Sequence, residues 1–272
     1  MKHIFRALLF LVAILPATCT QAQTAGDSLR ILWIGNSYTY VNDLPEMVTR
    51  LAGEQGLKLA PTRFLAGGAR LQDHYRNAKV VDALRKGGWD YIVMQEQSSN
   101  PAQATRDVIA DTYHYAKLLC DMAKEYSPQG HILMYMTWGH KNGNMQEHEQ
   151  TDADYPLDET YENFQSRIIT TYVEMAYENK TWCAPVGMAW REVRRQHPEI
   201  ELYTPDESHP SLKGTYLAAQ TILATILQKP FVSKISFDGI PMVEAYILTT
   251  TAQRTVLGNL HLLGIAPKQK SR

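Results

Sequence analysis

Several features are scarce in this 272-residue sequence, and each scarcity excludes a class of protein. Cysteine occurs three times; neither Cys120 nor Cys183 has metal-ligand spacing, so we expect two buried free thiols rather than a metal centre. Neither sign of charge dominates, because 27 Lys and Arg stand against 28 Asp and Glu. This balance gives no electrostatic basis for binding nucleic acid or an anionic membrane. Beyond the N-terminus no apolar run is long enough to form a transmembrane helix.

Residues 1–22 have the pattern of a secretory signal peptide rather than of folded structure. Lys2 and Arg6 form the positive start, a short apolar run follows, and Ala22 fits a cleavage site. We therefore expect export in a bacterium, to the periplasm or the medium. Lipid attachment at Cys19 is an alternative, although the residues before it match the usual lipobox poorly. Cleavage removes two positive charges and changes the formal net charge from −1 to −3.

The rest of the chain, over residues 27–267, is expected to form one α/β domain. Short apolar runs typical of buried strands alternate with longer runs of helical spacing, which favours a parallel sheet with helices on both faces. Five strands in this rhythm fit the flavodoxin-like order of a three-layer α/β/α sandwich, in which active sites lie at the carboxyl ends of the strands. The predicted strands are Arg30–Ile34, Leu59–Leu65, Tyr91–Gln95, Ile132–Thr137 and Thr181–Pro185. The predicted helices are Pro45–Gln55, Asn77–Arg85, Ala102–Tyr126, Leu157–Glu178, Ala189–Gln196, Leu212–Leu227 and Val243–Leu257.

A serine lies in a tight turn at the end of the first predicted strand. Apolar residues 31–34 are followed by the turn formers Gly35 and Asn36 and then by Ser37, and a helix with Pro45 at its start comes next. A strand, a turn with one serine and a helix is how α/β enzymes present a nucleophile, with backbone N–H groups directed at the same place. The pattern also suits a serine that only caps a turn, and this stretch alone does not decide between the two.

Asp206 and His209 lie three residues apart, far downstream and just before a predicted helix. A histidine can accept the proton of a serine nucleophile, and an aspartate can hold the imidazole in the correct tautomer. We therefore regard Ser37, His209 and Asp206 as a candidate catalytic triad.

The two blocks together, Gly-Asn-Ser ending at Ser37 and Asp-x-x-His-Pro starting at Asp206, resemble those of the SGNH hydrolases, also called the GDSL esterase/lipase superfamily. The first block of that superfamily usually reads Gly-Asp-Ser, so Asn36 is a variant, whereas the last block is intact. The resemblance covers about residues 29–227. It implies the SGNH fold and a serine esterase that forms an acyl-enzyme and requires no cofactor and no metal.

The resemblance also implies an oxyanion hole with three donors. The first is the N–H of Ser37, and the second comes from the paired glycines after the second strand, where Gly68 is our choice. The usual Gly-x-Asn-Asp block is absent; the chain after the third strand looks instead like the Gln-Gly-Glu-Ser type, found in branches that include carbohydrate acetylesterases. There a glutamine amide replaces the asparagine. This assigns the third donor to Gln95, with Gln97 as the alternative and Asn100 as a more distant one.

Residues 138–163 form the least regular part of the chain and are expected to lie over the strand ends. Their polar and aromatic side chains suit a sugar better than a fatty chain, although a solvated surface loop fits equally well. His140 and His148 and the acids near them match no common metal-site spacing.

The sequence therefore predicts an exported serine hydrolase that cleaves a carboxylic ester, with an acetyl ester on a carbohydrate as the favoured substrate. Two alternatives stay open. One is a non-catalytic carbohydrate-binding relic of the same fold. The other is a lipase or thioesterase, which requires an apolar groove near the strand ends.

Overall fold

A parallel sheet of five strands forms the centre of the molecule. The computed structural model describes residues 28–144, 159–234 and 237–265. The sheet has the order β2-β1-β3-β4-β5. Its strands are β1 (Leu29–Gly35), β2 (Leu59–Leu65), β3 (Tyr91–Met94), β4 (His131–Tyr135) and β5 (Trp182–Ala184). This is the flavodoxin-like order, and the predicted α/β/α class is confirmed.

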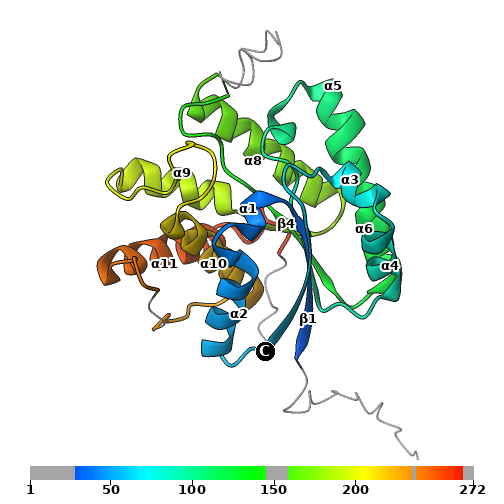
Figure 1. Ribbon diagram of the computed structural model, residues 1–272, viewed down its shortest axis with the longest axis horizontal. Helices are drawn as coiled ribbons and strands as arrows, with labels where there is room; N and C mark the ends of the chain where they lie inside the picture. The colour runs from blue at the N-terminus through cyan, green and yellow to red at the C-terminus, as the bar shows by residue number, and fades with distance from the viewer. Residues whose placement is uncertain (1–27, 145–158, 235–236, 266–272) are drawn as a thin grey trace, which may run out of the picture.

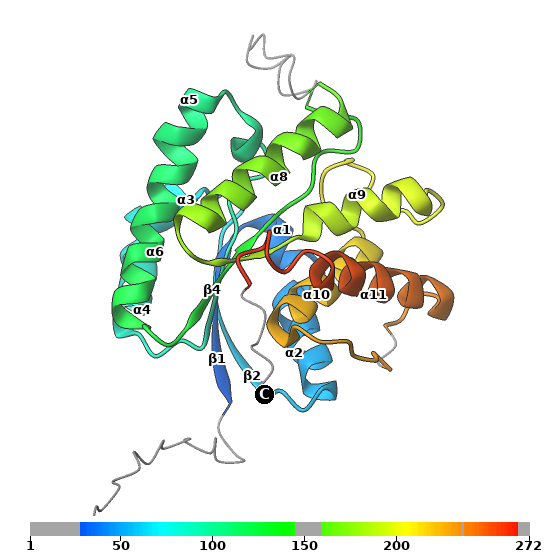
Figure 2. The same ribbon diagram turned by 180° about the vertical axis from the view of Figure 1, so that it is seen from behind.

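Helices cover both faces of the sheet, as Figures 1 and 2 show from opposite sides. One face carries α2 (Leu44–Glu54), α9 (Val186–Gln196) and α10 (Leu212–Leu227), with α11 (Met242–Leu257) packed against α9 and α10. The other face carries α3 (Leu71–Arg76), α4 (Ala78–Lys86), α6 (His114–Tyr126) and α8 (Tyr161–Glu178). The result is three layers with the sheet between two sets of helices.

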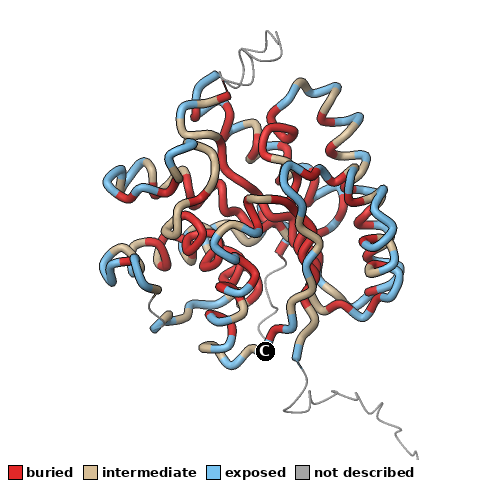
Figure 3. Tube along the Cα trace, viewed as in Figure 1, coloured by how far each residue is buried: buried red, intermediate tan, exposed pale blue. Residues whose placement is uncertain are grey.

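The apolar run of β1 serves both faces. Ile31 and Trp33 belong to the core cluster beneath α2, α9 and α10, whereas Leu32 and Ile34 belong to the cluster on the opposite face. Successive side chains of a strand point to opposite faces, so a strand covered on both sides must be apolar throughout. Figure 3 shows this burial along the central strands.

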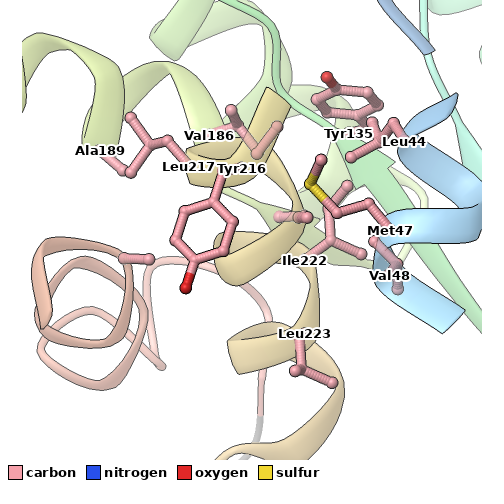
Figure 4. Close-up of a cluster of buried hydrophobic side chains, with 14 of the residues drawn as sticks. Leu44, Met47, Val48, Tyr135, Val186, Ala189, Tyr216, Leu217, Ile222 and Leu223 are labelled. Carbon is pink, nitrogen blue, oxygen red and sulfur yellow. The ribbon is translucent and has the colours of Figure 1, made fainter. Parts of the chain in front are cut away.

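Helix α10 is the most deeply buried helix of the first face. Every residue from Gly214 to Ile226 is buried, and Figure 4 shows Leu217 and Ile222 of this helix among Val48 of α2 and Val186 of α9. A helix that is buried along every turn is covered by other elements on all sides. Because α10 starts directly after the predicted Asp206–His209 block, this packing fixes the end of that block against the sheet.

The predicted helix Ala102–Tyr126 is wrong in its first part. A 3-10 turn covers Asn100–Ala102, α5 covers only Thr105–Asp107, and a π-helical turn over Val108–Tyr113 leads into α6. Apolar spacing does not distinguish these helical forms, which differ by one residue in the hydrogen-bond step. Two short helices at strand ends, α1 (Ser37–Tyr40) and α3, were also missed, because such helices depend on caps and tertiary contacts rather than on periodicity.

Several predictions fall outside the described residues: the signal peptide 1–22, lipid attachment at Cys19, and His148 with the nearby acids Asp152 and Asp154. Within the described ranges, no helix combines the length and apolar character needed to cross a bilayer. Cys120 and Cys183 are buried free thiols, as expected.

Candidate active site

Ser37 lies at the carboxyl end of β1, at the first position of helix α1 (Figure 1). Asn36 caps this helix, since its Oδ1 accepts the backbone N–H of Tyr38 at 3.0 Å. The Nδ2 of Asn36 donates to the backbone C=O of Ala69 at 3.1 Å. One side chain thus closes the serine turn and joins it to the loop after β2, which contains Gly68.

Gln95 lies beneath the Ser37 turn and is fully buried. Its Oε1 accepts the backbone N–H of Asn36 and the hydroxyl of Thr39, each at 2.9 Å. Its Nε2 donates to the backbone C=O of Glu96. In this structure the Gln95 amide is engaged by the backbone and by Thr39, and its role as an oxyanion donor stays a prediction. The third sequence block identified Gln95, but only the fold shows that its side chain supports the Ser37 turn from below.

Gln97, the alternative donor, is half-buried and caps the 3-10 turn that follows it. Its Oε1 accepts the backbone N–H groups of Ser99 and Asn100 at 2.7 and 3.0 Å, and its Nε2 lies 3.3 Å from the Ser98 hydroxyl. Asn100, the more distant candidate, donates its Nδ2 to the Asp111 carboxylate at 3.2 Å. Both amides therefore have structural partners of their own.

Two backbone donors of the predicted oxyanion hole are placed near the serine turn. Ser37 follows β1 directly, and Gly68 lies in the exposed turn after β2, the strand paired with β1. Gly68 has φ +67°, a left-handed conformation that favours glycine. Within the described ranges neither the N–H of Ser37 nor that of Gly68 has a hydrogen-bond partner. Both remain available to a ligand.

The structure brings His209 and Asp206 to Ser37, although 172 residues separate the serine from the histidine. Nε2 of His209 lies 2.8 Å from Oγ of Ser37. Nδ1 of His209 lies 2.6 Å from Oδ2 of Asp206. A hydroxyl, an imidazole and a carboxylate linked in this order can pass the serine proton to the imidazole.

Asp206 also shapes the loop that carries the histidine. Its Oδ1 accepts the N–H groups of Ser208 and His209 at 3.0 and 2.9 Å and the Thr204 hydroxyl at 2.7 Å. Partial burial raises the pKa of the Asp206 carboxyl, but these hydrogen bonds outweigh it and hold the pKa below its usual value. The ionised carboxylate favours the tautomer with a proton on Nδ1, which leaves Nε2 free to accept the serine proton.

Glu96 is a buried carboxyl that the sequence reasoning did not single out. It is 1% exposed, and its Oε1 accepts the backbone N–H groups of Leu71 and Gln97 at 3.2 and 2.6 Å. Burial raises its pKa to about 8, although the two hydrogen bonds and Arg70 act in the opposite direction. Glu96 therefore joins the start of α3 to the end of β3 next to the Ser37 turn. The feature of the sequence that could have identified Glu96 is the Gln-Glu pair directly after the buried strand β3.

Metal-binding geometry is not found in the part of the chain that the structure describes, where no group of three or more His, Cys, Asp or Glu side chains comes together. His140 packs edge-on against Phe164 with ring centroids 5.1 Å apart.

Solved structures of other proteins share this architecture. The chain is similar to a protein from Slackia heliotrinireducens described as a candidate SGNH hydrolase, with 26% sequence identity, 74% of this chain and 100% of that chain covered, and a TM-score of 0.59. A DUF4886 family protein from Bacteroides uniformis shares 18% identity over 85% of this chain and 95% of its own, with a TM-score of 0.68. An acetylxylan esterase from Geobacillus stearothermophilus shares 16% identity over 78% of this chain and 99% of its own, with a TM-score of 0.52. No family model matches the sequence, and no curated protein is similar enough to it to match.

These similarities show that the chain has the SGNH hydrolase fold, and they confirm the resemblance to the SGNH/GDSL superfamily that the sequence blocks indicate. The general class that the fold and the Slackia protein support is a hydrolase of the SGNH type. Which bond is cleaved, and by which residues, is a separate question.

Proposed function

We propose that this protein is an exported serine esterase that removes acetyl groups from a carbohydrate, with Ser37, His209 and Asp206 as its triad. The observation that carries the proposal is the hydrogen-bonded chain from Ser37 Oγ to His209 Nε2 at 2.8 Å and from His209 Nδ1 to Asp206 Oδ2 at 2.6 Å. Serine, imidazole and carboxylate in this order are the groups that acyl transfer requires.

The reaction has two steps. Ser37 Oγ attacks the ester carbonyl while His209 Nε2 takes its proton, and the N–H groups of Ser37 and Gly68 stabilise the oxyanion. Collapse breaks the bond to the sugar oxygen, which leaves as an alcohol with the proton from His209, and an acetyl-enzyme remains. His209 then takes a proton from water, the resulting hydroxide attacks the acetyl carbonyl, and acetate leaves as Ser37 regains its proton.

Three observations favour an acetylated carbohydrate as the substrate. The N-terminal segment has the pattern of an export signal. The sequence between β4 and α8 is rich in polar residues. Among proteins with this fold is an enzyme described as an acetylxylan esterase.

The first experiment measures acetate release from acetylated xylo-oligosaccharides, and turnover of 4-nitrophenyl acetate, by the mature wild-type protein. We expect Ser37→Ala and His209→Ala each to lower kcat by at least about 1,000-fold, because the two residues act as one unit. Ser166→Ala and His197→Ala remove the same groups from α8 and from the end of α9, away from this site, and are expected to leave kcat unchanged.

The same assay separates the alternatives. A carbohydrate-binding relic predicts no turnover by the wild type and no labelling of Ser37 by a fluorophosphonate probe. A lipase or thioesterase predicts efficient cleavage of long-chain esters without acetate release from sugars. Equal activity of the wild type and the Ser37→Ala variant contradicts the proposed triad.

A further inference from the structure

Tyr38, the residue directly after the candidate nucleophile, makes contacts that the reaction scheme does not use. Its side chain is 3% exposed, and its hydroxyl lies 2.6 Å from the hydroxyl of Ser208. Ser208 directly precedes His209. One hydrogen bond therefore joins the neighbour of the candidate nucleophile to the neighbour of its candidate base, across 170 residues of sequence.

The ring of Tyr38 reinforces this link. It lies edge-on to the His209 imidazole, with centroids 5.5 Å apart and an angle of 69° between the planes. On another side it stacks on Trp138, with centroids 4.7 Å apart and an angle of 5°. The indole Nε1 of Trp138 donates to the backbone C=O of Ser208 at 3.0 Å. Ser208 is thus held at its hydroxyl by Tyr38 and at its carbonyl by Trp138.

Buried, stacked aromatic rings lie beneath this arrangement. Trp138 is fully buried directly beyond the end of β4 and stacks on Trp190 of α9, with centroids 3.8 Å apart and an angle of 7°. By contrast, the side chains of His209 and Asp206 are 35% and 51% exposed. The exposed loop therefore takes its position from buried aromatic rings.

The internal hydrogen bonds of the 204–209 loop do not perform this task. They fix Asp206 against His209, because Asp206 accepts from its own loop neighbours. The distance from His209 to Ser37 depends instead on contacts between the loop and the rest of the fold, and among these the ones made by Tyr38 and Trp138 lie next to the histidine. An error of about 1 Å in such a distance can cost on the order of 100-fold in rate.

We propose that Tyr38 is a positioning residue, which sets the distance between Ser37 and His209 through its hydrogen bond to Ser208 and its stacking on Trp138. This inference rests on the proposed esterase function. Tyr38 does not exchange a proton in the reaction: burial raises the pKa of its phenol, so the hydroxyl stays protonated throughout the working pH range.

The test is a double-mutant cycle with 4-nitrophenyl acetate as substrate. Tyr38→Phe keeps the stacked ring and removes the hydroxyl, and Ser208→Ala removes the other partner. We expect each variant to lower kcat by about 10-fold with KM changed by less than about twofold, and the double variant to be no slower than the slower single variant. Independent effects would instead multiply to about 100-fold.

Tyr216→Phe is the matched control. Tyr216 is also buried, in α10, and its hydroxyl lies 3.2 Å from that of Thr249. Its loss should lower thermal stability without changing kcat. If Tyr38→Phe also lowers only the melting temperature and leaves kcat within twofold of the wild type, the inference is overturned.

The rate of Ser37 labelling by a fluorophosphonate adds a readout that a purely structural role does not move. It should fall in parallel with kcat for Tyr38→Phe and Ser208→Ala. Unaltered labelling in both folded variants, or multiplicative effects in the cycle, contradicts the positioning role. If the wild type itself neither turns over the ester nor labels, the proposed function fails, which is a different result from an active wild type with an equally active Tyr38→Phe variant.

Discussion

The amide of Asn36 donates a hydrogen bond that the aspartate usual in this motif cannot donate. Its Oδ1 accepts from Tyr38 N–H, and its Nδ2 donates to the C=O of Ala69. A carboxylate has no donor for that carbonyl. The amide therefore holds the serine turn and the Gly68 turn together, so this departure from the usual sequence has a structural reason.

Glu96 gives the protein a pH dependence of stability. Its pKa is raised by burial to about 8 from a reference value of 4.5, so the folded state binds a proton that the unfolded state has lost in this range. The resulting stability is fully present below about pH 4.5 and is lost as pH rises toward 8. We expect Glu96→Gln, which resembles the protonated acid and keeps an acceptor for Leu71 and Gln97, to lose less stability between pH 5 and pH 8 than the wild type.

Urea unfolding of the wild type and Glu96→Gln at a series of pH values measures this difference. A tenfold change in the proton affinity of a carboxyl on folding corresponds to about 1.4 kcal/mol, so the difference in unfolding free energy should reach a few kcal/mol. Glu178→Gln, at the exposed end of α8, is the control that makes the same chemical change at the surface. Parallel stability curves for the wild type and Glu96→Gln would show that Glu96 is ionised in the folded protein.

At the scale of the element, the serine turn is tightly packed as well as hydrogen-bonded. A Cβ at Gly35 would lie 2.7 Å from both Gln95 Oε1 and Thr39 Oγ1. Beneath the turn the Thr39 hydroxyl donates a hydrogen bond to Gln95 Oε1 at 2.9 Å. The turn therefore requires glycine because there is no room for a side chain.

Gly35→Ala is expected to reduce stability by about 1–3 kcal/mol, because the added methyl displaces buried, hydrogen-bonded groups. It should also lower kcat by at least about 10-fold, since Ser37 moves with the turn. Gly53→Ala in α2 is the matched control: its Cβ would meet nothing within 4 Å, and it should increase stability by about 0.5–1 kcal/mol. Chemical denaturation together with ester turnover checks both variants; a fully active, fully stable Gly35→Ala would show that the turn has spare room.

At the scale of the whole molecule, α11 completes the outer side of one layer. It packs on α10 and α9, with Leu248 and Ala252 fully buried. This gives a packing role to residues 242–257, which lie beyond the part of the chain that carries the motifs. Other side chains of α11 face solvent, including Tyr246, which is 71% exposed.

Leu248→Ala should lower the free energy of unfolding by about 2–5 kcal/mol through the cavity that it leaves. For a domain of this size the melting temperature should fall by about 5–15 °C. At 20 °C kcat should be unchanged, because α11 packs mainly on α10 and α9 rather than on the Ser37 turn. Tyr246→Ala, on the same helix, should alter stability by less than about 0.5 kcal/mol. Thermal unfolding and ester turnover test this, and a loss of kcat in folded Leu248→Ala would mean that α11 acts on the site.

The sequence by itself predicted the sheet and placed a candidate site at the ends of its strands. Apolar runs bounded by turn formers located all five strands to within about two residues. Burial on both faces gives the central strands a strong local pattern, whereas the edge strand β2 is only partly buried. The ends of α10 were also predicted correctly. Ser37, Asp206 and His209 were identified because their chemistry depends on residue types at short local spacings.

Only the tertiary structure decided which groups support those residues. Gln95 was singled out by its motif, and only the structure shows that its amide hydrogen-bonds Asn36, Thr39 and Glu96 beneath the turn. The link from Tyr38 to Ser208 joins residues 170 positions apart. Contacts of this kind leave no local periodicity or spacing in the sequence, because they arise when the ends of separate strands and loops meet in space.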